Sequence, residues 1–130
     1  MTTCLVIDES SIVAKVAARI LTGIDLTTVG AESVAGAARL LAEPGAAAPV
    51  LVLVSASLQN TTVDASVRAL RADPRTAKAK ILVSLVESNL GTMTRAKRAG
   101  ADGFIFRPFD RASLLEWVGP FVQAATPVAA

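Results

Sequence analysis

Histidine and tyrosine are absent from this sequence of 130 residues, and Cys4 is its one cysteine. Without histidine, Ser-His-Asp and Cys-His catalysis, histidine proton shuttles and histidine-ligated metal sites are excluded. One cysteine allows no disulfide within the chain, and without histidine beside it a structural zinc site is excluded too. Because Cys4 lies inside an apolar run, we interpret it as a buried small hydrophobic residue.

Long apolar runs are also missing. No run reaches the roughly 18 apolar residues that indicate a transmembrane helix. The N-terminal sequence MTTCLVIDES has no basic region and reaches an acidic residue at Asp8, which argues against a signal peptide. We therefore expect a cytoplasmic protein that does not bind a membrane.

The composition is that of a globular domain. Hydrophobic residues make up 52% of the chain, charged residues 18% and aromatic residues 4%, so the core must be built from Val, Leu, Ile and Ala. A chain of this length is expected to form one domain with a substantial core. We place that domain at residues 1–123 and a flexible C-terminal tail at residues 124–130 (AATPVAA).

The chain is organised around the stretch PVLVLVSASL, in which five apolar residues lead into Ser55 without polar alternation. Such a run is typical of a strand buried on both faces of a parallel sheet. Similar runs alternate with helical patterns along the whole chain. We expect strands at Thr3–Ile7, Leu26–Val29, Val50–Val54, Lys80–Val86 and Gly103–Arg107, and helices at Ser11–Thr22, Val34–Ala42, Val63–Ala72, Thr92–Ala99 and Arg111–Val118.

Strands and helices in alternation predict an α/β fold, a flavodoxin-like three-layer sandwich with a parallel sheet of order 2-1-3-4-5 and five helices. In that order the first and third strands are neighbours, so Asp8, Glu9 and Ser55 should meet at their carboxyl ends.

Ile12 and Val16 fall on the apolar side of the first helix. Thr61 is expected to cap the third helix, and Gly119-Pro120 to bend or end the last.

Charge is distributed unevenly along the chain. Residues 1–67 carry a net charge of −3 and residues 68–130 a net charge of +5. This difference in charge between the two halves indicates either a surface that binds a partner or a set of solvent-exposed helix faces, and we favour the second interpretation.

Three segments in order, LVIDESSIVAKVAARIL, LRADP and AGADGFIFRPF, resemble the receiver domains of two-component response regulators, in particular single-domain CheY-like receivers. The resemblance covers about residues 3–122. It implies an acidic pair, a phosphoacceptor position, a hydroxyl position, a cation before a cis-proline and a switch aromatic. These correspond to Asp8 and Glu9, Ser55, Leu85 (or Ser84 if the register shifts by one), Arg107 before Pro108, and Phe104.

The departures from the family pattern have chemical consequences. Ser55 is not the carboxylate that accepts the phosphoryl group in receivers, and a serine is a weak nucleophile without an adjacent base. Asp8 and Glu9 alone should bind Mg²⁺ weakly or not at all, so we expect no cofactor. Arg107 can instead pair with one of these carboxylates. We therefore expect a degenerate pseudo-receiver that cannot be phosphorylated in the usual way and is not an enzyme.

The resemblance implies a phosphorylation-independent interaction or regulatory module in two-component signalling. Its partner would be a histidine kinase, a phosphotransferase or a flagellar or chemotaxis component, bound through a cationic face or through the first helix. We expect no nucleic-acid binding, because the basic stretch lacks aromatic residues. Two alternatives stay open: a sensor of a small anionic ligand such as a cyclic dinucleotide, and a receiver with residual phosphotransfer. The cationic face consists of Arg95, Lys97, Arg98 and Arg111.

Overall fold

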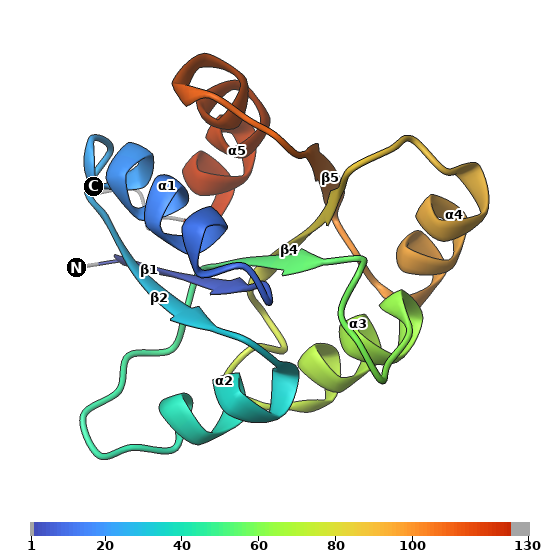
Figure 1. Cartoon of the computed structure of the whole chain (residues 1–130). Coiled ribbons are helices and arrows are strands. Elements are labelled where there is room, and N and C mark those ends of the chain that lie inside the picture. The colour runs from blue at the N-terminus through green and yellow to red at the C-terminus, as the bar shows by residue number, and fades with distance from the viewer. Residues whose placement is uncertain (1, 126–130) are drawn as a thin grey trace.

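Five parallel strands form one sheet in the order β2-β1-β3-β4-β5, as predicted from the sequence. The computed structural model describes residues 2–125, and the side chains of residues 2–122 (Figure 1). The strands are β1 (Thr2–Ile7), β2 (Leu26–Ala31), β3 (Leu51–Ser55), β4 (Lys80–Leu85) and β5 (Gly103–Phe106). The helices are α1 (Ser11–Thr22), α2 (Val34–Leu41), α3 (Val63–Ala72), α4 (Leu90–Ala99) and α5 (Arg111–Ala125).

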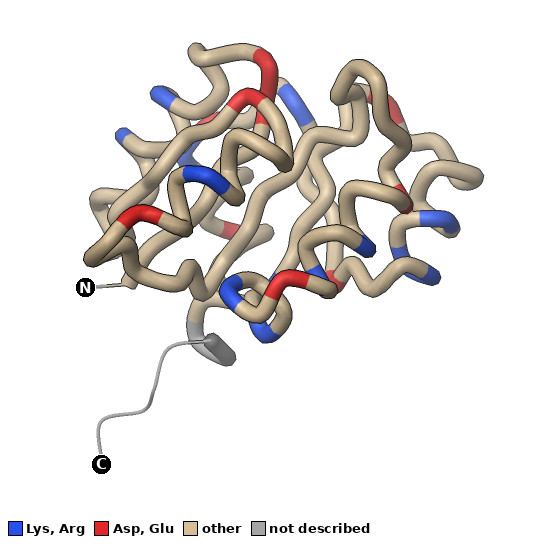
Figure 2. Tube along the Cα trace, turned by 90° about the horizontal axis from the view of Figure 1, so that it is seen from below, with Lys and Arg blue, Asp and Glu red and all other residues tan. Residues whose placement is uncertain are grey.

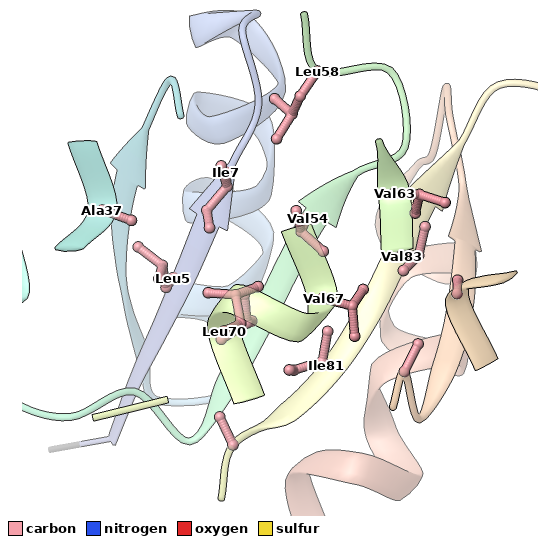
Figure 3. Close-up of a cluster of buried hydrophobic side chains, with 14 of the residues drawn as sticks. Leu5, Ile7, Ala37, Val54, Leu58, Val63, Val67, Leu70, Ile81 and Val83 are labelled. Carbon is pink, nitrogen blue, oxygen red and sulfur yellow. The ribbon is translucent and has the colours of Figure 1, made fainter. Parts of the chain in front are cut away.

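The sheet is covered on both faces, which gives the predicted three layers. Leu5, Val54 and Ile81 point to one face and pack under α2, α3 and α4, with Val67 and Leu70 of α3 (Figure 3). The alternate strand residues point to the other face and pack under α1 and α5. Burial on both faces explains why the central strands are uniformly apolar. None of the helices in the described residues is long and apolar enough to cross a membrane.

Helix α5 is longer than the sequence predicts. The helix continues through Gly119 and Pro120 to Ala125, although a proline removes one backbone donor from a helix. Packing explains this continuation, since Val118 is fully buried and the ring of Phe121 lies against Gly103 of β5. Two residues of the predicted tail, 124 and 125, thus belong to α5, and the rest of that tail lies outside the described residues.

The cap of α3 differs from the sequence expectation. Thr62, not Thr61, caps α3, because its hydroxyl accepts a hydrogen bond from the N–H of Ala65 at 3.2 Å. Ser10 precedes α1 but makes no side-chain cap; its N–H instead donates to Asp8 Oδ1 at 2.8 Å. The loop after β1 is therefore organised by a carboxylate of the candidate site.

Arg71 of α3 ties together the segments that enter β4 and β5. Its guanidinium donates twice to the carbonyl of Gly100, at 3.0 and 2.7 Å, and to the carbonyls of Ala77 at 2.9 Å and Ala79 at 2.7 Å. It also pairs with Asp102 at 2.8 Å. Three carbonyls that have no ladder partner are thereby satisfied.

Replacing Arg71 by methionine should lower the free energy of unfolding by about 2–4 kcal/mol, because several half-buried acceptors lose their donor. Arg68→Met on the same helix is the matched control. Arg68 is 67% exposed and pairs only with Asp64 among the described residues, so its loss should cost about 0.5 kcal/mol or less. Urea unfolding of both variants measures the difference, and equal stabilities would contradict this role of Arg71.

Candidate functional site

Four polar side chains converge where the parallel strands end. Successive residues of a strand point to opposite faces, so a residue shares its face with the one two positions earlier. Those earlier residues, Val6, Leu53, Leu82 and Ile105, all lie in the core under α1 and α5. The same alternation directs Asp8, Ser55, Ser84 and Arg107 to that side of the sheet.

Arg107 links this group. Its Nη2 donates to Ser55 Oγ at 3.2 Å and to the carbonyl of Ser84 at 3.5 Å. Its Nη1 lies 3.5 Å from Asp8 Oδ2. The side chains of the ion pair are 14% exposed for Arg107 and 5% for Asp8, so solvent screens the pair weakly. The peptide between Arg107 and Pro108 is cis, as the resemblance implies.

The two neighbouring acids take different roles. Asp8 is buried and faces Arg107, while its other oxygen accepts from the N–H of Ser10. Glu9 is exposed and turns to the loop after β3, where its Oε2 accepts from the N–H of Gln59 at 3.0 Å. Only one carboxylate of the predicted pair therefore faces the cation.

The hydroxyl of Ser55 is held by donors. The N–H of Ser57 donates to it at 3.0 Å, and Arg107 donates to it from the other side. Among the described residues no hydrogen bond links this hydroxyl to a carboxylate. A serine becomes an effective nucleophile when a base accepts its proton, so this arrangement does not activate Ser55.

Of the two candidates for the hydroxyl position, Ser84 lies in the site and Leu85 does not. Ser84 is in register with Ser55, and its Oγ is buried without a hydrogen-bond partner among the described residues. Leu85 points to the opposite face, into the core under α2, α3 and α4. The predicted switch residue, Phe104, is half-buried and packs against that same core.

The site does not fit a divalent cation well. In the described part of the chain, no group of three or more acidic or cysteine side chains is gathered as a metal centre. The guanidinium of Arg107 occupies the space between Asp8 and Ser55, where a cation would need carboxylate and water ligands. A bound Mg²⁺ would have to displace this guanidinium.

The four predicted cations do not form one face. Arg95, Lys97 and Arg98 lie on α4, in the layer of α2 and α3. The guanidinium of Arg111 lies near Gly23 at the end of α1, where an added Cβ on Gly23 would be 3.1 Å from it. The prediction is wrong for Arg111, because α5 packs with α1 on the other side of the sheet. Figure 2 shows cationic positions spread around the trace, with a group at the side where Figure 1 places α4.

An apolar hollow beside the ion pair was not predicted as a functional feature. It measures about 370 Å³, and its lining includes Ile12, Val16, Val86, Phe109 and Arg107. Ile12 is 69% exposed, Val16 39% and Val86 60%, so the apolar side of α1 is buried only in part. In the sequence, Ile12 is an apolar residue in the first turn of a helix. Core residues and exposed binding residues both show this pattern, so the sequence does not distinguish them.

We predict energetic coupling between Asp8 and Arg107. In a double-mutant cycle with Asp8→Asn and Arg107→Gln, the coupling energy from chemical unfolding should be about 1–3 kcal/mol, since one change leaves the other charge buried and unpaired. A parallel cycle with Glu9→Gln should be additive, because Glu9 faces Gln59 instead. Additive effects in both cycles would contradict the coupling.

No family model and no curated protein sequence matches the chain. Solved structures do match its fold. A response regulator from Thermotoga maritima aligns with a TM-score of 0.81 and 22% identity, over 95% of this chain and 98% of the other. The chemotaxis response regulator CheY4 of Vibrio cholerae aligns with a TM-score of 0.79 and 21% identity, over 93% and 98%.

A third similar structure is the receiver domain of sensor histidine kinase PA1611 from Pseudomonas aeruginosa, described with magnesium coordinated in its active-site cleft. It aligns with a TM-score of 0.76 and 15% identity, over 94% of this chain and 98% of the other. The match spans nearly the whole length in each case, and the strand order is the same as predicted. The chain therefore has the flavodoxin-like, CheY-like fold of response-regulator receiver domains.

Proposed function

We propose that this chain is a pseudo-receiver: a module of two-component signalling that binds other proteins without being phosphorylated. The observation that carries the proposal is the ion pair between Asp8 and Arg107, whose guanidinium also donates to Ser55 at the end of β3. This pair occupies the edge of the sheet where a receiver would carry out phosphoryl transfer. We propose that the site is not enzymatic and holds no cofactor.

The chemistry of phosphoryl transfer supports this proposal. Transfer depends on positioning the nucleophile and on stabilising the negative charge that spreads over the phosphoryl oxygens. Here the residue at the end of β3 is a hydroxyl that accepts two hydrogen bonds, and the nearby cation is already paired with Asp8. An incoming phosphoryl group would therefore meet neither an ionised nucleophile nor a free metal site.

Incubation with acetyl phosphate and Mg²⁺, followed by intact-mass spectrometry, tests the proposal. We expect no phosphoryl adduct under conditions in which an ordinary receiver is modified. A stable, Mg²⁺-dependent adduct would overturn the proposal. If Ser55→Ala abolished such an adduct, the alternative of residual phosphotransfer through Ser55 would replace it.

Restoring a carboxylate at the end of β3 should restore metal binding. Ser55→Asp adds a second buried carboxylate beside Asp8, so we expect Mg²⁺ affinity to rise about tenfold, equivalent to about 1.4 kcal/mol. Ser57→Asp is the matched control, because it adds the same charge two residues away at an exposed position. Calorimetric titration with Mg²⁺ measures both, and equal affinities would contradict the geometry of the site.

We further propose that the hollow beside α1 contacts the partner protein. Ile12 and Val86 expose apolar side chains there, and large exposed apolar residues that line one hollow are typical of protein interfaces. Arg107 joins this hollow to the ion pair, so a protein bound there would contact the site directly. A histidine kinase or a histidine phosphotransfer protein is the partner we propose.

The two possible interaction surfaces can be distinguished by mutation. With candidate histidine kinases and phosphotransfer proteins of the source organism, Ile12→Asp should weaken binding at least about tenfold, because central apolar residues dominate interfaces. Leu90→Asp is the matched apolar control, since Leu90 is 81% exposed on α4 and lies outside this hollow. Loss of binding in Arg95→Glu/Arg98→Glu but not in Ile12→Asp would assign the partner to α4 instead.

A further inference from the structure

A second hollow lies at the opposite end of the sheet from Arg107. It measures about 460 Å³ and is formed by the loop that enters β3, residues 48–50, and the loop that enters β4, residues 74–80. Because the strands are parallel, these entry loops share the amino-terminal edge, while Ser55 and Ser84 end the same two strands. This hollow is therefore separate from the candidate site described above and does not depend on the function proposed for it.

Cations line this hollow and no carboxylate does. Arg75, Lys78 and Lys80 all face it. The nearest acid along the chain, Asp73, accepts three hydrogen bonds from Arg75, at 2.9, 3.0 and 2.9 Å. This pairing lowers the pKa of Asp73 and keeps it ionised beside Arg75. In the described residues no ion pair involves either lysine, so the hollow has an excess of positive charge.

The loop that carries Lys78 is fixed before any ligand binds. The carbonyls on either side of it, those of Ala77 and Ala79, both accept hydrogen bonds from Nη1 of Arg71. Lys80 is fixed in turn, because its N–H donates to the carbonyl of Val50 at 3.0 Å. A site whose backbone is already ordered loses less conformational freedom on binding.

Apolar groups form the remaining walls. Pro49, Val50 and Pro74 line the hollow together with alanine side chains. Its volume falls within the range of about 300–1,000 Å³ that is usual for small-molecule sites. Lysines act as point charges toward phosphate. Small-molecule sites are lined mainly by apolar side chains, which contact the body of the ligand.

We infer that this hollow binds a small organic phosphate of nucleotide size, with its phosphates at Lys78 and Lys80 and its apolar body against Pro49 and Pro74. The loops that would contact this ligand lead into β3, the central strand, and into its neighbour β4. The chain would then carry a ligand site at the amino-terminal edge of the sheet in addition to the ion pair at the carboxyl edge.

Calorimetric titration of the full chain with ATP and with GTP, in magnesium-free buffer, tests the inference. At least one nucleotide should bind saturably with a Kd below about 1 mM. Lys78→Gln/Lys80→Gln should weaken that binding at least tenfold. Arg95→Gln/Arg98→Gln removes the same charge from α4 and should leave the Kd within twofold of the unaltered protein.

Two further ligands test separately the contributions of the phosphates and of the nucleoside to binding. Adenosine should show no saturable binding, and inorganic tripolyphosphate should bind more weakly than the nucleotide. Absence of binding by both nucleotides, or equal loss in the two double variants, would overturn the site. Equal affinity for tripolyphosphate and nucleotide would overturn the assigned ligand class.

Discussion

The ion pair between Asp8 and Arg107 is the interaction on which the character of the site depends. The pair lies at the carboxyl end of the sheet and is largely shielded from solvent, and Arg107 also donates to Ser55 and to the carbonyl of Ser84. Two buried charges that compensate each other make removal of either one costly. In the function we propose, this pairing keeps the cation from an incoming anion and the carboxylate from a metal. On this proposal, a chain with the receiver fold keeps its shape while its own side chains close the carboxyl edge of the sheet.

Parallel strand geometry explains why both candidate sites lie at the edges of the sheet. The carboxyl ends of β1, β3 and β4 bring polar residues together, and the period of two along each strand decides which of them share a face. The amino ends of β3 and β4 bring together two entry loops, which Arg71 and the bond between Lys80 and Val50 hold in place. The central strands themselves are apolar and buried on both sides, so chemistry is confined to these two edges.

The strand order and the proximity of Asp8 and Ser55 could be predicted from the sequence. Runs of apolar residues mark the buried strands, and the residue at which each run ends marks the carboxyl end of its strand. Sequence reasoning placed Leu85 at the hydroxyl position, with Ser84 as the alternative, since counting residues through a loop can be off by one. Alternation along β4 puts Leu85 in the core under α2, α3 and α4 and Ser84 beside Ser55. Sequence reasoning also grouped Arg111 with the α4 cations, because sequence proximity does not show which face a helix covers. The exposure of Ile12 and the continuation of α5 past Pro120 depend on tertiary packing, which the sequence pattern alone does not contain.

The central claim is that the carboxyl edge of this sheet does not accept a phosphoryl group or its mimic. Heteronuclear NMR of the labelled protein during titration with beryllofluoride and Mg²⁺ tests it most directly, because the mimic needs no phosphodonor and reports on each backbone amide. The account predicts no saturable shifts at the amides of Asp8, Ser55, Ser84 and Arg107. Saturable shifts confined to these amides would show that the ion pair opens to admit a phosphoryl mimic and would contradict the account.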